Sequence, residues 1–182
     1  MTGTRRALFI DRDGTLIVDV GYPRDPAQVE PLPGALDALR TLQAHYALVI
    51  VSNQSGIGRG LISPAEARAV HARVVERFGQ AGVAFAGAYY CPHDPGAGCA
   101  CRKPAPGLLL DAAHELGLDL AASVMIGDKP SDVAAGRAAG CGHAIRFGPA
   151  SDDGAPSCTD WPAVVAFLGS SVDLVLDVDG HR

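Results

Sequence analysis

The stretch "FIDRDGTL", residues 9–16, places an apolar strand directly before two aspartates, Asp11 and Asp13, and a glycine that permits a tight turn. Two carboxylates one residue apart repel each other unless a cation compensates them. In open α/β sheets, ligands bind beyond the carboxyl ends of the parallel strands. The stretch therefore predicts a strand whose end contributes acidic side chains to a site.

Short apolar segments alternate with helical patterns along the chain. The alternation predicts an α/β fold: a doubly wound, Rossmann-like parallel sheet with helices on both faces. A capping box at Ser63, Pro64 and Glu66 marks one helix start, and Gly117 and Gly140 mark two helix ends. The expected strands are 7–10, 47–51, 83–90, 123–127 and 143–147, and the expected helices are 34–45, 64–81, 105–117, 131–139 and 161–168.

The 182 residues are enough for one domain with a sizeable core. We expect a core over residues 1–147, and a C-terminal part over 148–182 that packs on the same domain. That part comprises a surface loop at 148–157, the short helix and an add-on strand within 171–180. The connections between the first strands are too short for a separate cap domain.

The formal net charge of −5 argues against a nucleic-acid or anionic-membrane partner, since both require a concentrated basic surface. The N-terminus lacks the apolar core of a signal peptide, and no segment reaches transmembrane length. We expect a cytoplasmic monomer whose partner is a small molecule.

The residues that follow the strands carry the chemistry. Asp11 and Asp13 follow the first strand, Ser52 follows the second, and Asp128 and Lys129 follow the fourth. Hard oxygen ligands favour Mg²⁺, which we expect among Asp11, Asp128 and the backbone carbonyl of Asp13. Asp11 would attack phosphorus and Asp13 would serve as acid and base. Ser52 and nearby amides would bind phosphoryl oxygens. Lys103, or Lys129 as a second candidate, would offset negative charge.

Three of the five cysteines lie beside a histidine: Cys91, His93, Cys99 and Cys101. A Cys3His set suits tetrahedral Zn²⁺, and a site with no open position is structural. We therefore expect a zinc-bound loop at 91–101 that fixes Arg102 and Lys103, which follow its last ligand. Cys141 and Cys158 lack partners at ligand spacing and are interpreted as ordinary small apolar residues.

Four segments in this order, "FIDRDGT", "VSNQSG", "CRKP" and "IGDKPSD", resemble the motifs of the haloacid-dehalogenase-like phosphatases over residues 7–147. The flanking segments "VDVGYP", "NQSGIGRG", "YYCPH" and "CRKPAPGLLLDAA" are similar to the heptose bisphosphate phosphatase branch of that family. The resemblance implies a sugar phosphate substrate, a heptose 1,7-bisphosphate that loses its 7-phosphate in activated-heptose biosynthesis.

The resemblance also implies roles for individual residues. The roles of Asp11, Asp13, Ser52 and Lys103 agree with those expected above, and Mg²⁺ would be bound by Asp11, Asp13 and Asp128. Arg102 would recognise substrate, and further substrate contacts are implied for Asp19, Gly21, Tyr22, Asn53, Gln54 and Ser55.

Several alternatives stay open from the sequence. Arg59 is either a substrate contact or a solvated loop residue, and Asp132 is a second-layer magnesium group, a helix cap with Ser131, or both. The five residues between His93 and Cys99 also match histidinol-phosphate phosphatases. A catalytically dead, zinc-stabilised binding module is the alternative from another functional class.

Overall fold

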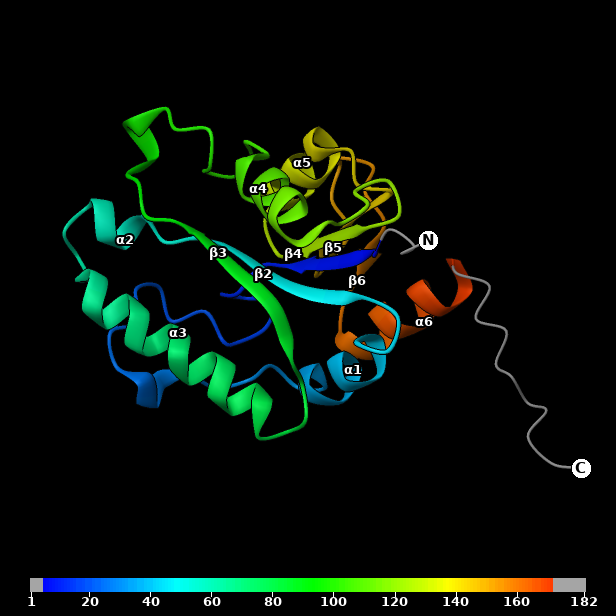
Figure 1. Ribbon diagram of the computed structural model, residues 1–182, viewed down its shortest axis with the longest axis horizontal. Helices are drawn as coiled ribbons and strands as arrows, with labels where there is room; N and C mark the ends of the chain where they lie inside the picture. Colours follow the sequence, from blue (N-terminus) through cyan, green and yellow to red (C-terminus); the bar gives the residue numbers. More distant parts are fainter. Residues whose placement is uncertain (1–4, 172–182) are drawn as a thin grey trace, which may run out of the picture.

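Six parallel strands form the centre of the molecule, in the order β3-β2-β1-β4-β5-β6 (Figure 1). In this computed structural model, residues 5–171 are described. The strands are β1 Ala7–Ile10, β2 Ala47–Asn53, β3 Phe85–Cys91, β4 Val124–Gly127, β5 His143–Phe147 and β6 Ser157–Cys158. The predicted parallel sheet is confirmed. β6 was not predicted: it begins in the expected loop at 148–157, where only two residues pair with β5.

Helices cover both faces of the sheet, as expected from the sequence. Side chains alternate along β1, so that Leu8 and Ile10 pack with α1, α3 and α6, whereas Ala7 and Phe9 pack with α4 and α5. Figure 1 shows α4 and α5 on one side of the sheet and α1, α3 and α6 on the other. The helices are α1 Ala35–Leu42, α2 Ser55–Gly58, α3 Pro64–Gly79, α4 Gly107–Leu116, α5 Pro130–Ala139 and α6 Trp161–Ser171, with 3-10 turns η1 Pro26–Gln28 and η2 Pro95–Ala97.

Local signals set several helix ends. Ser63 Oγ accepts a hydrogen bond from the Glu66 amide at 3.1 Å, and Glu66 Oε2 accepts one from the Ser63 amide at 2.7 Å, which is the predicted capping box. Gly117 and Gly140 cap α4 and α5 with φ of 63° and 84°. The helix predicted to reach residue 45 ends at Leu42, whose carbonyl accepts hydrogen bonds from the His45 and Tyr46 amides.

The strand order reverses beside β1. The chain adds β2 and β3 on one side of β1 and β4, β5 and β6 on the other, so the ends of β1 and β4 flank the switch point. Ligands of doubly wound sheets bind at this point. Within residues 5–171 every helix and strand belongs to this layered unit, and none forms a separate cap domain.

The C-terminal part packs on the same core as far as it is described. Trp161 is fully buried, and its Nε1 donates to the Thr15 carbonyl at 2.9 Å. The add-on strand expected within 171–180 lies outside the described residues. Of the helices described, none has both the length and the apolar character needed to cross a bilayer.

Candidate active site

The loop after β1 buries two carboxylates at the switch point. The Asp11 amide donates to the Ile126 carbonyl at 3.0 Å, which extends the pairing with β4 and holds Asp11 at the end of the sheet. Gly14 then turns the chain with φ of 85°, and a Cβ at this position would lie 2.5 Å from Oδ2 of Asp128. The glycine therefore permits both the turn and the close approach of a second strand-end aspartate.

Lys103 connects three elements in the interior. Its Nζ lies 2.6 Å from Oδ1 of Asp11 and 2.7 Å from Oδ1 of Asp132, and it donates to the Val51 carbonyl at 2.7 Å. Its side chain is 1% exposed. Burial by itself would lower the pKa of Lys103, but the two carboxylates raise it overall. Lys103 is therefore a cation that balances buried negative charge.

Asn53 holds Lys103 by its backbone. Its side-chain Oδ1 accepts from the Lys103 amide at 3.1 Å, and its Nδ2 donates to the Lys103 carbonyl at 3.0 Å. Both ends of the Asn53 amide thus engage this backbone, although Asn53 also lines the large polar cavity described below. The structure gives the residue a positioning contact beside the expected substrate contact.

Three carboxylates gather in reach of one cation: those of Asp11, Asp128 and Asp132 have oxygens within 4.8 Å of one another. Burial raises the pKa of Asp11 to about 7, opposed by Lys103, and burial also raises the pKa of Asp128. Oδ1 of Asp128 is buried and has no hydrogen-bond partner among the described residues. An orphaned oxygen beside two further carboxylates fits a divalent cation with oxygen ligands.

Asp132 has a larger part in this arrangement than its place after the motif suggested. Its Oδ2 accepts from the Lys129 amide at 2.9 Å at the start of α5, so Asp132 caps the helix, with Lys129 as its partner where Ser131 was expected. Its other oxygen pairs with Lys103. The sequence did not reveal this ion pair, because the two residues belong to separate segments that only the fold brings together.

The Asp13 carboxylate lies apart from these three. Nε and Nη2 of Arg12 donate to its two oxygens at 3.1 and 2.9 Å, and Gln54 Nε2 donates to Oδ2 at 2.8 Å. The same Gln54 nitrogen lies 2.8 Å from Ser52 Oγ. The partnership of Asp13 with Arg12 was also missed from the sequence. The position of Arg12, a cation between two aspartates at the end of a buried strand, was the sequence feature that could have predicted this pair.

A polar cavity of about 500 Å³ opens beside these groups. Three of its lining residues are cationic, Arg102, Lys103 and Lys129, and they suit an anionic ligand. Asp11 and Ser52 line a smaller cavity of about 30 Å³ that shares Asp13, Asn53, Lys103, Lys129 and Ser131 with the larger one. The larger one is lined by Asp13, Asp19, Gly21, Tyr22, Asn53, Gln54, Ser55, Gly56, Arg102, Lys103, Pro104, Lys129 and Ser131.

Arg59 is absent from both linings. Its Nη1 donates to the Tyr22 hydroxyl at 3.0 Å, and its Nε lies 3.4 Å from Oδ2 of Asp94. Arg59 therefore joins the loop that carries Tyr22 to the loop that carries the cysteine cluster. These contacts favour a role for Arg59 in holding the two loops together over a direct contact with substrate.

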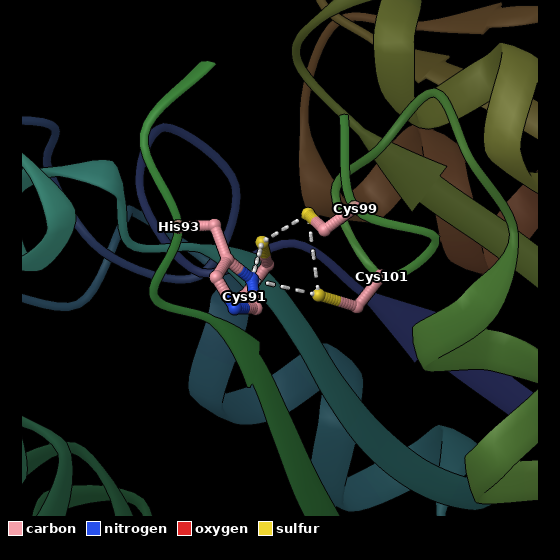
Figure 2. Close-up of side chains that lie close together, drawn as sticks. All are labelled: Cys91, His93, Cys99 and Cys101. Atoms are coloured by element: carbon pink, nitrogen blue, oxygen red, sulfur yellow. Dashed lines mark hydrogen bonds between the residues drawn. The ribbon is translucent and has the colours of Figure 1, made fainter. Parts of the chain in front are cut away.

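The cysteine cluster is assembled as expected. Figure 2 shows the side chains of Cys91, His93, Cys99 and Cys101 converging from the end of β3 and the following loop. Sγ of Cys91 lies 3.4 Å from His93 Nδ1 and 3.5 Å from Cys99 Sγ, and His93 Nδ1 lies 3.2 Å from Cys101 Sγ. Three thiols and one imidazole with ligand atoms within 4.8 Å of one another fit a tetrahedral zinc ion.

The switch-point carboxylates, the buried lysine and the Rossmann-like sheet together define a haloacid-dehalogenase-like hydrolase. Residues 100–145 match the HAD-hydrolase-like family. A D-glycero-beta-D-manno-heptose-1,7-bisphosphate 7-phosphatase of Yersinia pestis is 40% identical over 172 residues, covering 88% of this chain and 91% of the relative. The enzyme of that name from Vibrio cholerae is 44% identical over 147 residues, covering 76% of this chain and 79% of the relative.

A solved structure agrees with these relatives. The D,D-heptose 1,7-bisphosphate phosphatase of B. bronchiseptica, complexed with magnesium and phosphate, superposes with a TM-score of 0.83 at 32% identity, covering 92% of this chain and 99% of that one. The chain belongs to the family of the D-glycero-beta-D-manno-heptose-1,7-bisphosphate 7-phosphatases. The resemblance expected from the motifs is thereby confirmed.

Proposed function

We propose that this protein is a magnesium-dependent phosphomonoesterase that removes the 7-phosphate of a D-glycero-D-manno-heptose 1,7-bisphosphate in activated-heptose biosynthesis. The relatives named for this reaction, at 40% identity over most of the chain, support the substrate. The observation that carries the chemistry is Lys103 between Asp11 and Asp132, at the edge of a cavity lined by cations. We expect the protein to be a cytoplasmic monomer. Size-exclusion chromatography with light scattering would test the oligomeric state.

Asp11 is the nucleophile of the proposed reaction. One of its carboxylate oxygens attacks phosphorus while the bond from phosphorus to the sugar oxygen breaks, and Asp13 gives its proton to that oxygen. Water then attacks the phosphorus of the aspartyl phosphate and gives a proton to Asp13. The bond to Asp11 breaks, inorganic phosphate leaves, and both carboxyl groups are restored. Covalent catalysis of this kind divides one difficult displacement into two easier steps.

The remaining polar groups bind and orient the phosphate. Lys103 offsets the charge between Asp11 and the phosphoryl oxygens, and Ser52 with neighbouring amides accommodates those oxygens. Arg102 and Lys129 bind the rest of the anionic substrate from the cavity wall, together with the loop around Asp19, Gly21 and Tyr22. The segment Asn53, Gln54 and Ser55 also lines this cavity.

The magnesium ion would be held by Asp11 and Asp128, with the Asp13 carbonyl as a further ligand and Asp132 beside them. When bound, it would neutralise the carboxylates and polarise the phosphoryl group. The buried orphan oxygen of Asp128 supports this assignment.

Zinc would be held by Cys91, His93, Cys99 and Cys101. It would keep the loop before Arg102 and Lys103 in place and take no part in the reaction. A structural role follows from the absence of an open ligand position in a set of four.

A phosphate-release assay tests the function. Wild type, Asp11→Asn and Asp37→Asn are compared on heptose 1,7-bisphosphate and on histidinol phosphate. Asp37 is an exposed aspartate on α1 and serves as the matched control. We expect turnover of the heptose by wild type and Asp37→Asn and none by Asp11→Asn. Preference for histidinol phosphate would reassign the substrate, and equal activity in all three proteins would remove the proposed mechanism.

A further inference from the structure

Arg12 is a buried arginine for which the expected chemistry gives no role. It lies between the two motif aspartates and is 1% exposed. Its Nε and Nη2 donate to the two oxygens of Asp13 as a fork, the geometry that orients a carboxylate plane most strictly. Among the described residues, Asp13 is the only carboxylate that pairs with Arg12.

Stability alone is a weak reason for this pair. Removing a guanidinium and a carboxylate from water costs about as much as their attraction returns, so buried ion pairs are weak evidence for stabilisation. Arg12 also lines a cavity with apolar residues such as Ile57 and Ala67, where an apolar side chain would avoid the cost of burying a charge. The fork therefore points to control of the Asp13 carboxyl group.

We propose that Arg12 is a positioning residue that fixes the Asp13 carboxyl group for proton transfer to the leaving oxygen and from the attacking water. This inference rests on the proposed function. Gln54 completes the arrangement from a second direction through its bond to Oδ2 of Asp13.

The hydrogen bonds select one oxygen for the proton. A carboxylate has about four acceptor positions, two on each oxygen. Among residues 5–171, Oδ2 of Asp13 receives Arg12 Nη2 and Gln54 Nε2, whereas Oδ1 receives Arg12 Nε alone. The free position is therefore on Oδ1, and the proton that moves to the leaving group is carried there.

The two cavities that meet at Gln54 agree with this direction. Arg12 lines an apolar cavity of about 390 Å³ together with Ile57, Ala67 and Tyr90. Asp13 lines the polar cavity instead, and Gln54 lines both. Arg12 thus reaches Asp13 from the side of the apolar cavity, which leaves the other side of the carboxyl group open toward the substrate.

Leaving-group dependence tests the inference. An alkyl leaving group such as a sugar hydroxyl needs a proton, whereas p-nitrophenolate departs without one. We expect Arg12→Met to slow the release of the alcohol in a single turnover of heptose bisphosphate by about 10²-fold, the usual scale of general acid catalysis. The fold-loss in rate for p-nitrophenyl phosphate should be smaller by a factor of about ten or more. Arg12→Lys should behave like Arg12→Met, because an ammonium keeps the charge and lacks the fork.

Two further variants keep the test decisive. Gln54→Leu should also slow the reaction of heptose bisphosphate more than that of p-nitrophenyl phosphate. This variant replaces the Arg12 variants in the test if those fail to fold. Arg40→Met, which removes an exposed arginine paired with Asp37, should leave both rates unchanged. Equal losses on both substrates, in folded Arg12 and Gln54 variants, would overturn the inference. Wild type with no more activity than Asp11→Asn would instead overturn the proposed function.

Discussion

Nζ of Lys103 lies 2.6 Å from Oδ1 of Asp11, with both side chains withdrawn from solvent. A single ammonium also reaches Asp132, so one cation compensates two carboxylates that come from different segments at the same edge of the sheet. The lysine follows the cysteine cluster, whereas the carboxylates follow β1 and begin α5. The balance of charge at the site therefore depends on segments that are distant in sequence.

Lys103→Met should damage both folding and turnover. It leaves two buried carboxylates without their cation, and breaking a buried pair in this way costs about 3–5 kcal/mol of unfolding free energy. Loss of electrostatic stabilisation should lower kcat by about 10²-fold or more. Urea unfolding in the presence of a chelator and a phosphate-release assay measure the two effects.

Lys129→Met is the matched control for stability. Its ammonium lies 3.4 Å from Asp19 and its side chain is 53% exposed. An exposed pair contributes about 1 kcal/mol or less, so the unfolding free energy should change little. Equal unfolding free energies for Lys103→Met and Lys129→Met would show that the buried pairing contributes little to stability.

Gly127→Ala should displace Asp132. A Cβ at Gly127 would lie 2.4 Å from Oδ2 of that residue, the oxygen that caps α5. Overpacking of this kind costs about 1–3 kcal/mol, and the shifted carboxylate should weaken the hold on Lys103 and lower kcat. Thermal unfolding and steady-state kinetics provide the measurement.

Gly79→Ala is the corresponding control, because a Cβ at the last residue of α3 would meet nothing within 4 Å. Alanine is the better helix former by about 1 kcal/mol, so this variant should be as stable as wild type or slightly more stable. A Gly127→Ala protein with the stability and kcat of Gly79→Ala would contradict the crowding argument.

Cys91→Ser should remove zinc from the protein. Cys91 is fully buried and its Sγ contacts two other members of the cluster. Metal analysis should find about one zinc per wild-type chain, as a four-ligand structural site binds a single ion, and much less in the variant. The melting temperature of the wild type, but not of the variant, should then fall when a strong chelator is added.

Cys158→Ser tests whether replacing a buried cysteine outside the cluster also removes zinc. Cys158 is 3% exposed in β6 and packs in the core away from the cluster. This variant should keep its zinc and its response to the chelator even if it is less stable. Equal zinc content in the Cys91 and Cys158 variants would rule out the assigned ligand set.

His71 should make stability depend on pH. Burial, with a smaller effect of Arg12, lowers the pKa of His71 to about 4, and the ring packs edge-on against Tyr90 with centroids 4.8 Å apart. Between pH 4 and the ordinary histidine value of about 6.5, the unfolded chain binds a proton that the folded chain does not. Stability therefore rises with pH across this window.

Replacing the ring isolates that contribution. His71→Phe keeps a flat side chain against Tyr90 and has no proton to bind, so its melting temperature should rise less between pH 4 and 6.5 than that of wild type. The two proteins should follow parallel profiles above that window. Identical slopes below pH 6.5 would show that His71 titrates normally in the folded state.

Much of the site could be read from the order of residues along the chain. Apolar strands followed at once by Asp11, Ser52 and Asp128 predicted which residues would gather, because parallel strands bring their carboxyl ends to one edge of the sheet. The cysteine spacing predicted the four-ligand cluster in the same way. These features depend on local pattern and on one general property of α/β sheets.

The partners of individual side chains were decided only by the folded chain. The sequence predicted the backbone carbonyl of Asp13 as a magnesium ligand and an acid-base role for its carboxylate, but it did not reveal the partners of that carboxylate. In the structure, the carboxylate bonds to Arg12 and Gln54, and the side chain beside Asp11 and Asp128 is that of Asp132. A side chain takes the rotamer that satisfies its nearest donors and acceptors, and those neighbours come from separate segments whose approach depends on packing. Residue order thus determined the edge of the sheet at which the chemistry occurs, and tertiary packing decided which charges compensate one another there.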